Sequence, residues 1–518
     1  MALEKIVSKV SSYLHPPKYV QAATLISLGG ILFGLDTGTI GPLTIMPQST
    51  QTFGPLSSTI HGLVVSTILI PAALSSFFGG HIANTLGRLK GIAVGAAIFG
   101  LGAGIEAASV KLGMLIAGRA VKGIGEGLFL STSVVYITEI SPPRSRGTLA
   151  SIPQFMTTIG VCAGYFTCYG TVSLPSSASW RLPFALQSFI ACLFVLTTLL
   201  FLPESPRWLT ATGRHPEAIL IWEKLGIDTT EREKIEESGS REALSEVKTL
   251  DILSVFSPDA YRQTALGVFL MAMQQASGID GVLYYAPLLF SRAGLSSSTS
   301  SFLASGISAL LMFLITIPAF LLADSWGRRP SAIVGGVIQV FCMFLIGGLF
   351  LGGDGEVKGV KGWVVVVAIY VFAVGFSGTW GVTLRVYTSE IQGPKTRAGA
   401  SSLALSANWT VNWIIAFTTP IFLAHSSFGV YFLFGSTTLL TVVVCIFWMP
   451  ETRGRTLEDI DASFRRKHRK TEREDVELSL RGRGEGLLVG EFGSGEGEGD
   501  GKSGVVVNVG ESSSASVV

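Results

Sequence analysis

Twelve apolar segments, each close to twenty residues long, dominate the sequence. They can be drawn at residues 20–42, 61–83, 91–109, 112–137, 149–170, 184–202, 264–290, 301–323, 331–351, 363–388, 399–424 and 428–449. A helix needs ~20 mostly apolar residues to cross a bilayer, where every backbone polar group must be satisfied internally. Only 14% of the residues are charged, against ~25% in a soluble domain. We therefore expect an all-α membrane protein with twelve transmembrane helices.

The segments form two sets of six with a polar stretch between them. This layout predicts a cytoplasmic N-terminus (1–19), an N-terminal six-helix bundle (20–202), a cytoplasmic loop domain (203–262), a C-terminal six-helix bundle (263–449) and a cytoplasmic, largely disordered tail (450–518). Lys and Arg in short loops indicate the cytoplasmic side. They gather on the side of the two termini, as at Arg88 and Lys90, so we expect both termini in the cytoplasm.

The two halves of the chain repeat each other. Glu139 and Arg146 end the fourth segment, and Glu390 and Arg397 end the tenth at the same spacing. Such a repeat is typical of a transporter built from two bundles around a central site. The net charge of +2 argues against a large nucleic-acid surface. Without a metal-ligand cluster or a nucleophile–base set in the sequence, we expect no enzyme, no cofactor and no bound metal.

Several motifs occur together in a fixed order. They are FGLDTG (33–38), Gly118-Arg119, YITE (136–139), PESPRW (203–208), QQASGI (274–279), DSWGRR (324–329) and PETRG (450–454). Through them, residues 20–460 resemble the sugar porter family of the major facilitator superfamily. The resemblance implies two six-helix bundles that rock about a central site for a sugar or polyol. We expect a monomer in a lipid bilayer, with the plasma membrane as its location.

Asp36 is the only charged residue between positions 20 and 46. A charge at the centre of a membrane helix costs at least ~2.5–3.5 kcal/mol, so it is a functional candidate. The resemblance pairs Asp36 with Arg119 and implies proton coupling, and a permanent structural ion pair is the alternative. Lys122 and Glu126 lie four residues apart, so either they pair with each other or Glu126 competes with Asp36 for Arg119.

By the resemblance, sugar hydroxyls would meet four amides: Gln154, Gln274, Gln275 and Asn408. An amide side chain both donates and accepts hydrogen bonds, which suits a polyol. The alternative is that these amides bond neighbouring helices to each other.

Two predicted substrate-site residues depart from the family pattern. Asp280 stands where the family has Asn, and Arg385 where it has Trp. Because opposite charges are less costly when paired, we expect Asp280 and Arg385 to face each other across the cavity. Three roles stay open: a structural salt bridge, binding of an anionic group of a sugar acid by Arg385, and a second titratable element.

A further set of charged residues lies at predicted cytoplasmic helix ends, where carboxylates and guanidiniums can pair and close an inner gate. The set is Arg88, Glu139, Arg146, Glu204, Arg207, Asp324, Arg328, Arg329, Glu390, Arg397, Glu451 and Arg453. Asn84 stands where the family has an acidic residue, which predicts a weaker lock in the first half.

The function that these features favour is secondary active transport of a sugar or sugar-like polyol by proton symport. The alternatives are a facilitative uniporter, a transporter of an anionic sugar acid that uses Arg385, and a sensor that binds sugar without moving it. Sensors of this fold carry long tails with docking repeats. The tail of this chain contains no repeat, so sensing is the weakest of these.

Overall fold

The computed structural model describes residues 17–142, 145–227, 256–257, 260–295, 298–351, 357, 359–392, 396–455 and 464. The chain divides into two compact units, residues 1–463 and 464–518, and all helices named below belong to the first. Half of the predicted loop domain (228–255 and 258–259) and nearly all of the predicted disordered tail lie outside the described residues. The side chains of Arg146, Asp324 and Arg397 lie outside them as well.

The first half of the chain is helical throughout its predicted segments. Its helices are α2 (Lys18–Ser27), α3 (Gly29–Ile45), α4 (Pro47–Phe53), α5 (Ser58–Ser66), α6 (Leu69–Leu86), α7 (Arg88–Ala107), α8 (Leu112–Ile140), α9 (Arg146–Thr171) and α10 (Ala178–Phe201). The first span is formed by α2 and α3 and the second by α5 and α6, whereas each of the other four spans of this half is one helix. Two short helices, α11 (Pro206–Ala211) and α12 (His215–Leu225), follow.

The second half repeats this plan. Its helices are α14 (Tyr261–Ala276), α15 (Ile279–Tyr284), α16 (Ala286–Arg292), α17 (Ser298–Trp326), α18 (Arg328–Leu351), α19 (Val360–Gly378), α20 (Trp380–Glu390), α21 (Arg397–His425) and α22 (Gly429–Phe447). Among the described residues, ten helical stretches are long and apolar enough to cross a membrane. The remaining two predicted spans are α9 and α21, which are as long but carry more polar side chains. The prediction of an all-α protein with twelve membrane helices is confirmed.

Glycines allow the helices of the first half to pack closely. α3 lies along α9 and α7 lies along α8. A Cβ atom on Gly34 would run into the carbonyl oxygen of Thr157, and one on Gly38 into that of Val161. Small residues that admit such close backbone contact are typical of helix pairs in lipid. Asp36 lies between these two glycines, so the packing of α3 on α9 fixes its position.

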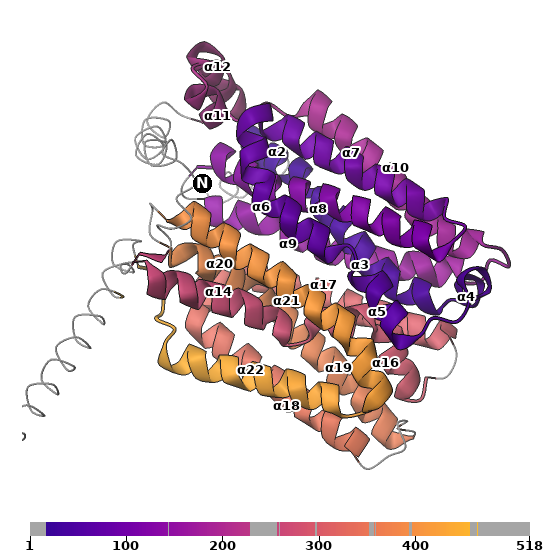
Figure 1. The fold of residues 1–518 in the computed structure, drawn as a ribbon. Coiled ribbons are helices and arrows are strands. Elements are labelled where there is room, and N and C mark those ends of the chain that lie inside the picture. The colour runs from indigo at the N-terminus through magenta and orange to yellow at the C-terminus, as the bar shows by residue number, and fades with distance from the viewer. Residues whose placement is uncertain are drawn as a thin grey trace, which may run out of the picture. The chain divides into compact units, whose positions relative to one another are not determined.

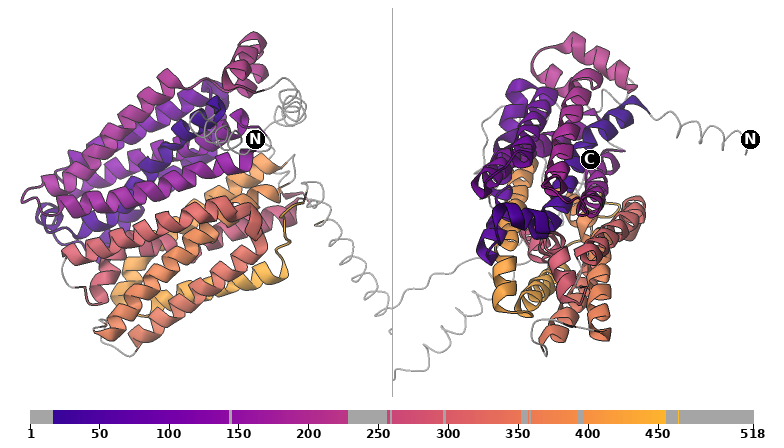
Figure 2. Two further views of the ribbon diagram at one scale, coloured as in Figure 1. Left: turned by 180° about the vertical axis from the view of Figure 1, so that it is seen from behind. Right: turned by 90° about the vertical axis from the view of Figure 1, so that its right-hand side faces the viewer.

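The two halves lie side by side, the first drawn from indigo to magenta and the second from pink to yellow (Figure 1 and Figure 2). They meet where α9 packs on α17 and where α21 packs on α5 and α6. The hydroxyl of Tyr165 donates a hydrogen bond to the carbonyl of Leu283 in the other half. Aromatic rings add to this interface, since Phe33 meets Trp409 edge-on with ring centres 5.6 Å apart.

Candidate functional site

Asp36 and Arg119 lie together in the buried interior of the first half. The two terminal nitrogens of Arg119 donate to the two carboxylate oxygens of Asp36, each at 3.3 Å. One of them also donates to the backbone carbonyl of Val65 at 3.0 Å. Both side chains are almost fully buried. The structure therefore brings together the two residues that the sequence paired.

Lys122 is a second cation beside Asp36. Its Nζ donates to Oδ1 of Asp36 at 2.6 Å, to Oε2 of Glu106 at 2.7 Å and to the side-chain oxygen of Gln187. Glu106 also lies 3.7 Å from Arg119. The structure shows neither of the expected arrangements of Lys122 and Glu126: Lys122 bonds α3, α7 and α10 instead of its own helix, and Asp36 keeps Arg119.

The packing of α7 on α8 assembles these charges. Arg119, Lys122 and Glu126 are spaced three and four residues apart, which places them on one face of α8. A Cβ atom on Gly102 would lie 2.5 Å from the backbone nitrogen of Lys122, and one on Gly118 would lie 2.9 Å from Cγ of Glu106. The two glycines therefore let α7 and α8 approach until Glu106 reaches Lys122.

Glu126 completes a layer of five ionisable side chains, which we call the buried ion layer: Asp36, Glu106, Arg119, Lys122 and Glu126. Its side chain is fully buried, and neither carboxylate oxygen has a hydrogen-bond partner. The other four members are joined by ion pairs of 2.6–3.7 Å. Glu126 is thus in the layer but outside its network of contacts.

Three of the predicted sugar-binding amides lie together in the second half. Asn408 on α21 donates to the side-chain oxygen of Gln274 at 3.2 Å and accepts from Gln275 at 3.2 Å. Gln274 also donates to the carbonyl of Trp380 at 2.8 Å. Gln154 on α9 is half-buried, and no hydrogen bond ties it to this cluster. In this conformation the three amides of the second half bond to one another.

Asp280 joins this cluster because the seventh span is broken. Gly278 adopts a φ of 84° between α14 and α15, a conformation that favours glycine. Asp280 follows in the first turn of α15, where it accepts a hydrogen bond from Asn412 at 2.6 Å. The sequence analysis did not predict Asn412 as a site residue. Broken helices are common at the substrate sites of transporters.

Arg385 does not form the expected salt bridge with Asp280 in this conformation. Among the described side chains, no ion pair or hydrogen bond joins the two, although they lie within electrostatic range of each other. Arg385 is accessible to solvent on α20, whereas Asp280 is bonded to Asn412. Tyr284 is on α15, which packs on α3, and lies within electrostatic range of Asp280, Glu126 and Asp36.

A charged network lies at one end of the first half. Nε and one terminal nitrogen of Arg88 donate to Glu139, the shortest contact being 2.7 Å. The other terminal nitrogen donates to the side-chain oxygen of Asn84 at 2.7 Å. Glu204 accepts from the backbone N–H groups of Arg88 and Leu89. The amide of Asn84 therefore supplies a neutral acceptor for Arg88. A hydrogen bond to a neutral acceptor is weaker than one to a carboxylate, so the weaker lock in the first half stays a prediction.

The second half carries the equivalent network. Arg328 donates to Glu390 at 2.8 Å, and the hydroxyl of Thr452 donates to the other oxygen of Glu390 at 2.6 Å. Glu451 accepts from the backbone N–H groups of Arg328 at 2.9 Å and Arg329 at 3.0 Å, at the N-terminus of α18. A carboxylate at that end of a helix is favoured by the exposed N–H groups. Both networks join helices within one half.

Glu451 lies just beyond the last span, so its titration reports on this network. Partial burial raises the pKa of this carboxyl. Four hydrogen bonds lower the pKa by more than burial raises it, and they come from the backbone N–H groups of Arg453, Arg328, Arg329 and Thr452. The resulting pKa lies below the ordinary value of a glutamate.

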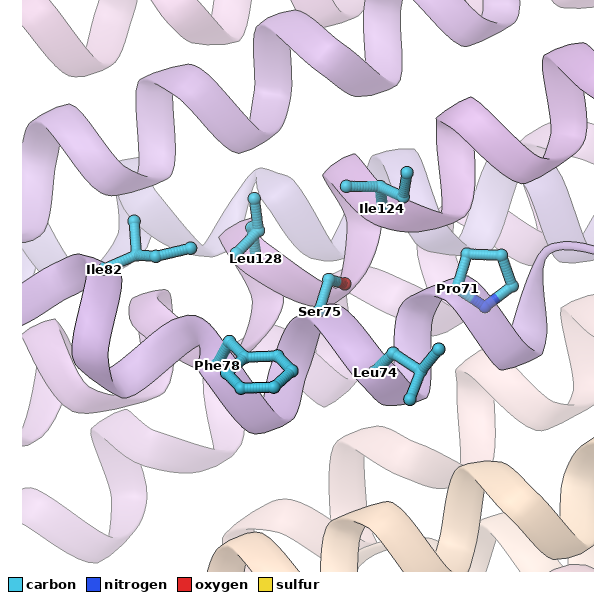
Figure 3. A pocket seen from close by; sticks show the side chains of 7 residues that line it. All are labelled: Pro71, Leu74, Ser75, Phe78, Ile82, Ile124 and Leu128. Carbon is cyan, nitrogen blue, oxygen red and sulfur yellow. The ribbon is translucent and has the colours of Figure 1, made fainter. Parts of the chain in front are cut away.

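An apolar hollow of about 550 Å³ lies between α6 and α8 (Figure 3). Its only polar lining residue is Ser75, whose hydroxyl donates to the carbonyl of Ala72 in its own helix at 3.2 Å. Leu74 and Phe78 on its rim are exposed. A sugar needs several hydrogen-bonding groups, so this hollow is not a sugar site.

Comparisons with known proteins agree on a membrane transporter. Residues 22–464 match the family described as "Sugar (and other) transporter". The chain is 32% identical to the glucose transporter GlcP of Staphylococcus epidermidis, over 85% of this chain and 96% of that one. It is 32% identical to the quinate permease of Neurospora africana, over 85% of this chain and 88% of that one.

A solved structure with the same fold is the xylose transporter XylE from E. coli in a partially occluded inward-open conformation. It is 28% identical to this chain, with a TM-score of 0.70 and coverage of 85% of this chain and 99% of that one. A second structure of XylE, with a TM-score of 0.71, is titled a proton:xylose symporter. These fold and sequence relatives are transporters and not enzymes.

Proposed function

Because the chain belongs to the sugar transporter family of the major facilitator superfamily, we propose that it is a proton symporter for a sugar or a sugar-like polyol. The single observation that carries the proposal is the position of Asp36. In a buried transporter interior, a carboxylate is tolerated only if cations balance its charge or if it binds a proton. In the structure, Arg119 and Lys122 balance the charge of Asp36.

Rocking of the helices couples this carboxylate to transport. While Arg119 and Lys122 lie beside Asp36, their charges favour its ionised form. Movement that draws α3 away from α8 leaves the carboxylate without a cation in an apolar interior, where binding of a proton is favoured. The XylE structure titled a proton:xylose symporter supports the same mode of transport for this chain. A permanent structural ion pair would instead stay intact through the cycle.

The amide cluster of the second half is the proposed sugar site. The side-chain oxygens of Gln275 and Asn412 are buried and have no hydrogen-bond partner. Sugar hydroxyls would donate to these two acceptors and break the weaker amide–amide contacts of 3.2 Å. Gln154 is proposed to complete the site from the first half, since a substrate that contacts both halves can drive their movement.

A polyhydroxylated acid is the second candidate substrate. Arg385 is exposed to solvent and has no hydrogen bond or ion pair with the described side chains, and a guanidinium binds carboxylates in a bidentate manner. The relative named quinate permease favours this candidate, because quinate carries both hydroxyls and a carboxylate. Asp280 would then set the site's specificity by repelling an anion placed away from Arg385.

The experiment that tests both proposals is uptake by proteoliposomes that contain the full chain. Neutral sugars, polyols and sugar acids are offered in turn, and proton entry is followed with a trapped pH dye. We expect one class to enter together with protons, and Asp36→Asn to abolish the proton signal. Substrate entry without any proton signal, unchanged in Asp36→Asn, would show a uniporter. Binding without entry would show a sensor.

Arg385 is tested with a matched pair of variants. If it binds a carboxylate, Arg385→Gln lowers uptake of the sugar acid at least tenfold while uptake of a neutral sugar changes little, and Arg385→Lys keeps part of the acid uptake. Equal loss for acids and neutral sugars in Arg385→Gln would reject the acid candidate.

We further propose that the protein acts as a monomer in the plasma membrane with both termini in the cytoplasm.

A further inference from the structure

Glu126 is the one member of the buried ion layer that no described cation contacts. Asp36 and Glu106 each lie within 4 Å of both Arg119 and Lys122. Glu126 is fully buried, and both of its carboxylate oxygens lack hydrogen-bond partners. A buried polar group without a partner needs an explanation, and a missing ligand is one.

The charges of the layer do not balance if all its members are ionised. Three carboxylates, Asp36 from α3, Glu106 from α7 and Glu126 from α8, face the two cations of α8. Gln187 on α10, which accepts a hydrogen bond from Lys122, and Tyr284 on α15 are neutral polar groups near the layer. The guanidinium of Arg181 on α10 donates to the carbonyls of Ala107 and Ser109 at the end of α7. One negative charge is therefore left over, on the side chain without partners.

A proton fits this position better than a metal ion. Metal cations such as Ca²⁺ and Mg²⁺ need six or so oxygen ligands, and the described residues hold no group of three acidic, His or Cys side chains able to bind one. Both oxygens of Asp36 and Oε2 of Glu106 already accept hydrogen bonds from Arg119 or Lys122, and Oε1 of Glu106, which has no hydrogen-bond partner, lies 3.7 Å from the guanidinium of Arg119. A proton needs a single carboxylate oxygen, which Glu126 offers.

We propose that Glu126 is a second proton-binding site of this transporter, and that it holds the coupled proton in the conformation described while Asp36 is ionised. This inference rests on the proposed proton symport. An O–H bond forms on Glu126 with a proton from one aqueous side, and the same bond breaks when the proton leaves to the other side. Nothing is oxidised or reduced, and no other group is transferred.

The geometry links this proton to the substrate site. Glu126 shares one face of α8 with Arg119 and Lys122, so a small turn of either cation from Asp36 to Glu126 would expel the proton. Tyr284 lies within electrostatic range of Glu126 and Asp36 on one side and Asp280 on the other. Substrate that displaces Asp280 or its helix α15 thereby acts on the layer. Asp36 and Glu126 then alternate as the protonated carboxyl.

The first test detects the proton directly. Infrared spectra of the purified full chain at neutral pH are expected to show the carbonyl stretch of a buried protonated carboxylic acid. This band is expected to be lost in Glu126→Gln and kept in Glu106→Gln, the matched control whose carboxylate is ion-paired.

Stability gives a further readout. Since protonated Glu126 is neutral, Glu126→Gln and Glu126→Leu are expected to keep the melting temperature close to that of the wild type, whereas Glu106→Gln is expected to lower it. Absence of the band from the wild type, or its persistence in both Glu126 variants, overturns the inference.

The second test separates the inference from the proposed symport. The ratio of protons to substrate, measured from reversal potentials in proteoliposomes, is expected to fall in Glu126→Gln. If the wild type moves protons and Glu126→Gln has the same ratio, Glu126 is not a coupling site although symport stands. If the wild type moves no protons but the infrared band depends on Glu126, symport fails while the proton site stands. Stabilisation of the wild type, but not of Glu126→Gln, by sodium at constant ionic strength would assign a cation to the site and overturn the inference.

Discussion

Lys122 is the residue on which the buried ion layer depends most. It contacts Asp36, Glu106 and Gln187, and its side chain is fully buried. Its ammonium also lies about 5 Å from the ring centres of Phe99 and Phe184, a cation–π arrangement. Removal of this one cation leaves two buried carboxylates to share Arg119.

We therefore predict that Lys122→Met lowers the free energy of unfolding by ~3–5 kcal/mol, because removing one partner of a buried pair leaves uncompensated charge. Denaturant or thermal unfolding in detergent measures this. Lys111→Met, at an exposed position just before α8, is the control and should stay within ~0.5 kcal/mol. Adding Glu106→Leu to Lys122→Met should recover part of the loss. Equal effects of the two lysine variants would mean that Lys122 does not hold the layer together.

A second prediction at this scale concerns acid stability. Because the pKa of Glu451 is lowered below its ordinary value of 4.5, its stabilising effect is complete above that value and is lost as the pH falls through the lowered pKa of the folded state. The melting temperature of the wild type should exceed that of Glu451→Gln at neutral pH, and the difference should shrink below about pH 4.5. Glu223→Gln, at an exposed position on α12, is the control and should show no such difference. A gap between wild type and Glu451→Gln that stays constant into acid would contradict this assignment.

The sequence predicted part of the buried ion layer. Asp36 and Arg119 stand in recognisable motifs, and the structure joins them. Glu106 and Gln187 were missed because they lie 16 and 65 residues from Lys122, and no pattern in the sequence fixes how α7 and α10 align with α8. A signal was present, since Glu106 is also a lone acidic residue near the end of an apolar segment.

At the scale of helices, the contact between α7 and α8 depends on small residues at defined positions. Gly102 faces the backbone of Lys122, whereas a Cβ atom on Gly104 of the same helix would meet only the side chain of Ser188, at 3.5 Å. The two glycines thus lie on the same helix, but only Gly102 faces the backbone of a neighbouring helix. The sequence predicted both helices but could not show which glycine faces the ion layer.

We predict that Gly102→Ala costs ~1–3 kcal/mol, since overpacking forces neighbouring backbones apart, and that Gly104→Ala is close to neutral. Unfolding of the two variants in detergent checks the difference. Gly102→Ala should also weaken transport, because Lys122 would move away from Glu106. If Gly102→Ala and Gly104→Ala are equally stable, the close contact of α7 with α8 at Gly102 is contradicted.

The breaks within spans also belong to this scale. The sequence predicted one continuous segment at 264–290, whereas the structure divides it into α14, α15 and α16. Apolarity alone cannot reveal a break, because the broken and the continuous segment bury the same side chains. Gly278, with its positive φ, was the available signal, and it is this break that turns Asp280 toward Asn412.

At the scale of the whole molecule, the two charged networks each join helices of one half, whereas the contacts between the halves that the structure describes include aromatic and polar ones. His61 on α5 meets Tyr285 edge-on with ring centres 5.1 Å apart, and the hydroxyl of Tyr165 bonds the carbonyl of Leu283. Each half therefore carries its own charged network, so the contacts between the halves can change while each network holds its own half together, and α3 can still shift against α8 within the first half. The twelve-helix plan followed from the sequence, but the gating roles of Arg146 and Arg397 stay predictions, since their side chains lie outside the described residues.

The most direct test of the central claim is accumulation of substrate against its own gradient. Proteoliposomes that contain the full chain are loaded with substrate at the outside concentration, and an inward proton gradient is then imposed. A symporter that uses Asp36 is predicted to concentrate substrate inside until the proton gradient is dissipated, and Asp36→Asn is predicted to abolish this accumulation. Equal substrate concentrations on both sides, whatever the proton gradient, would contradict proton symport.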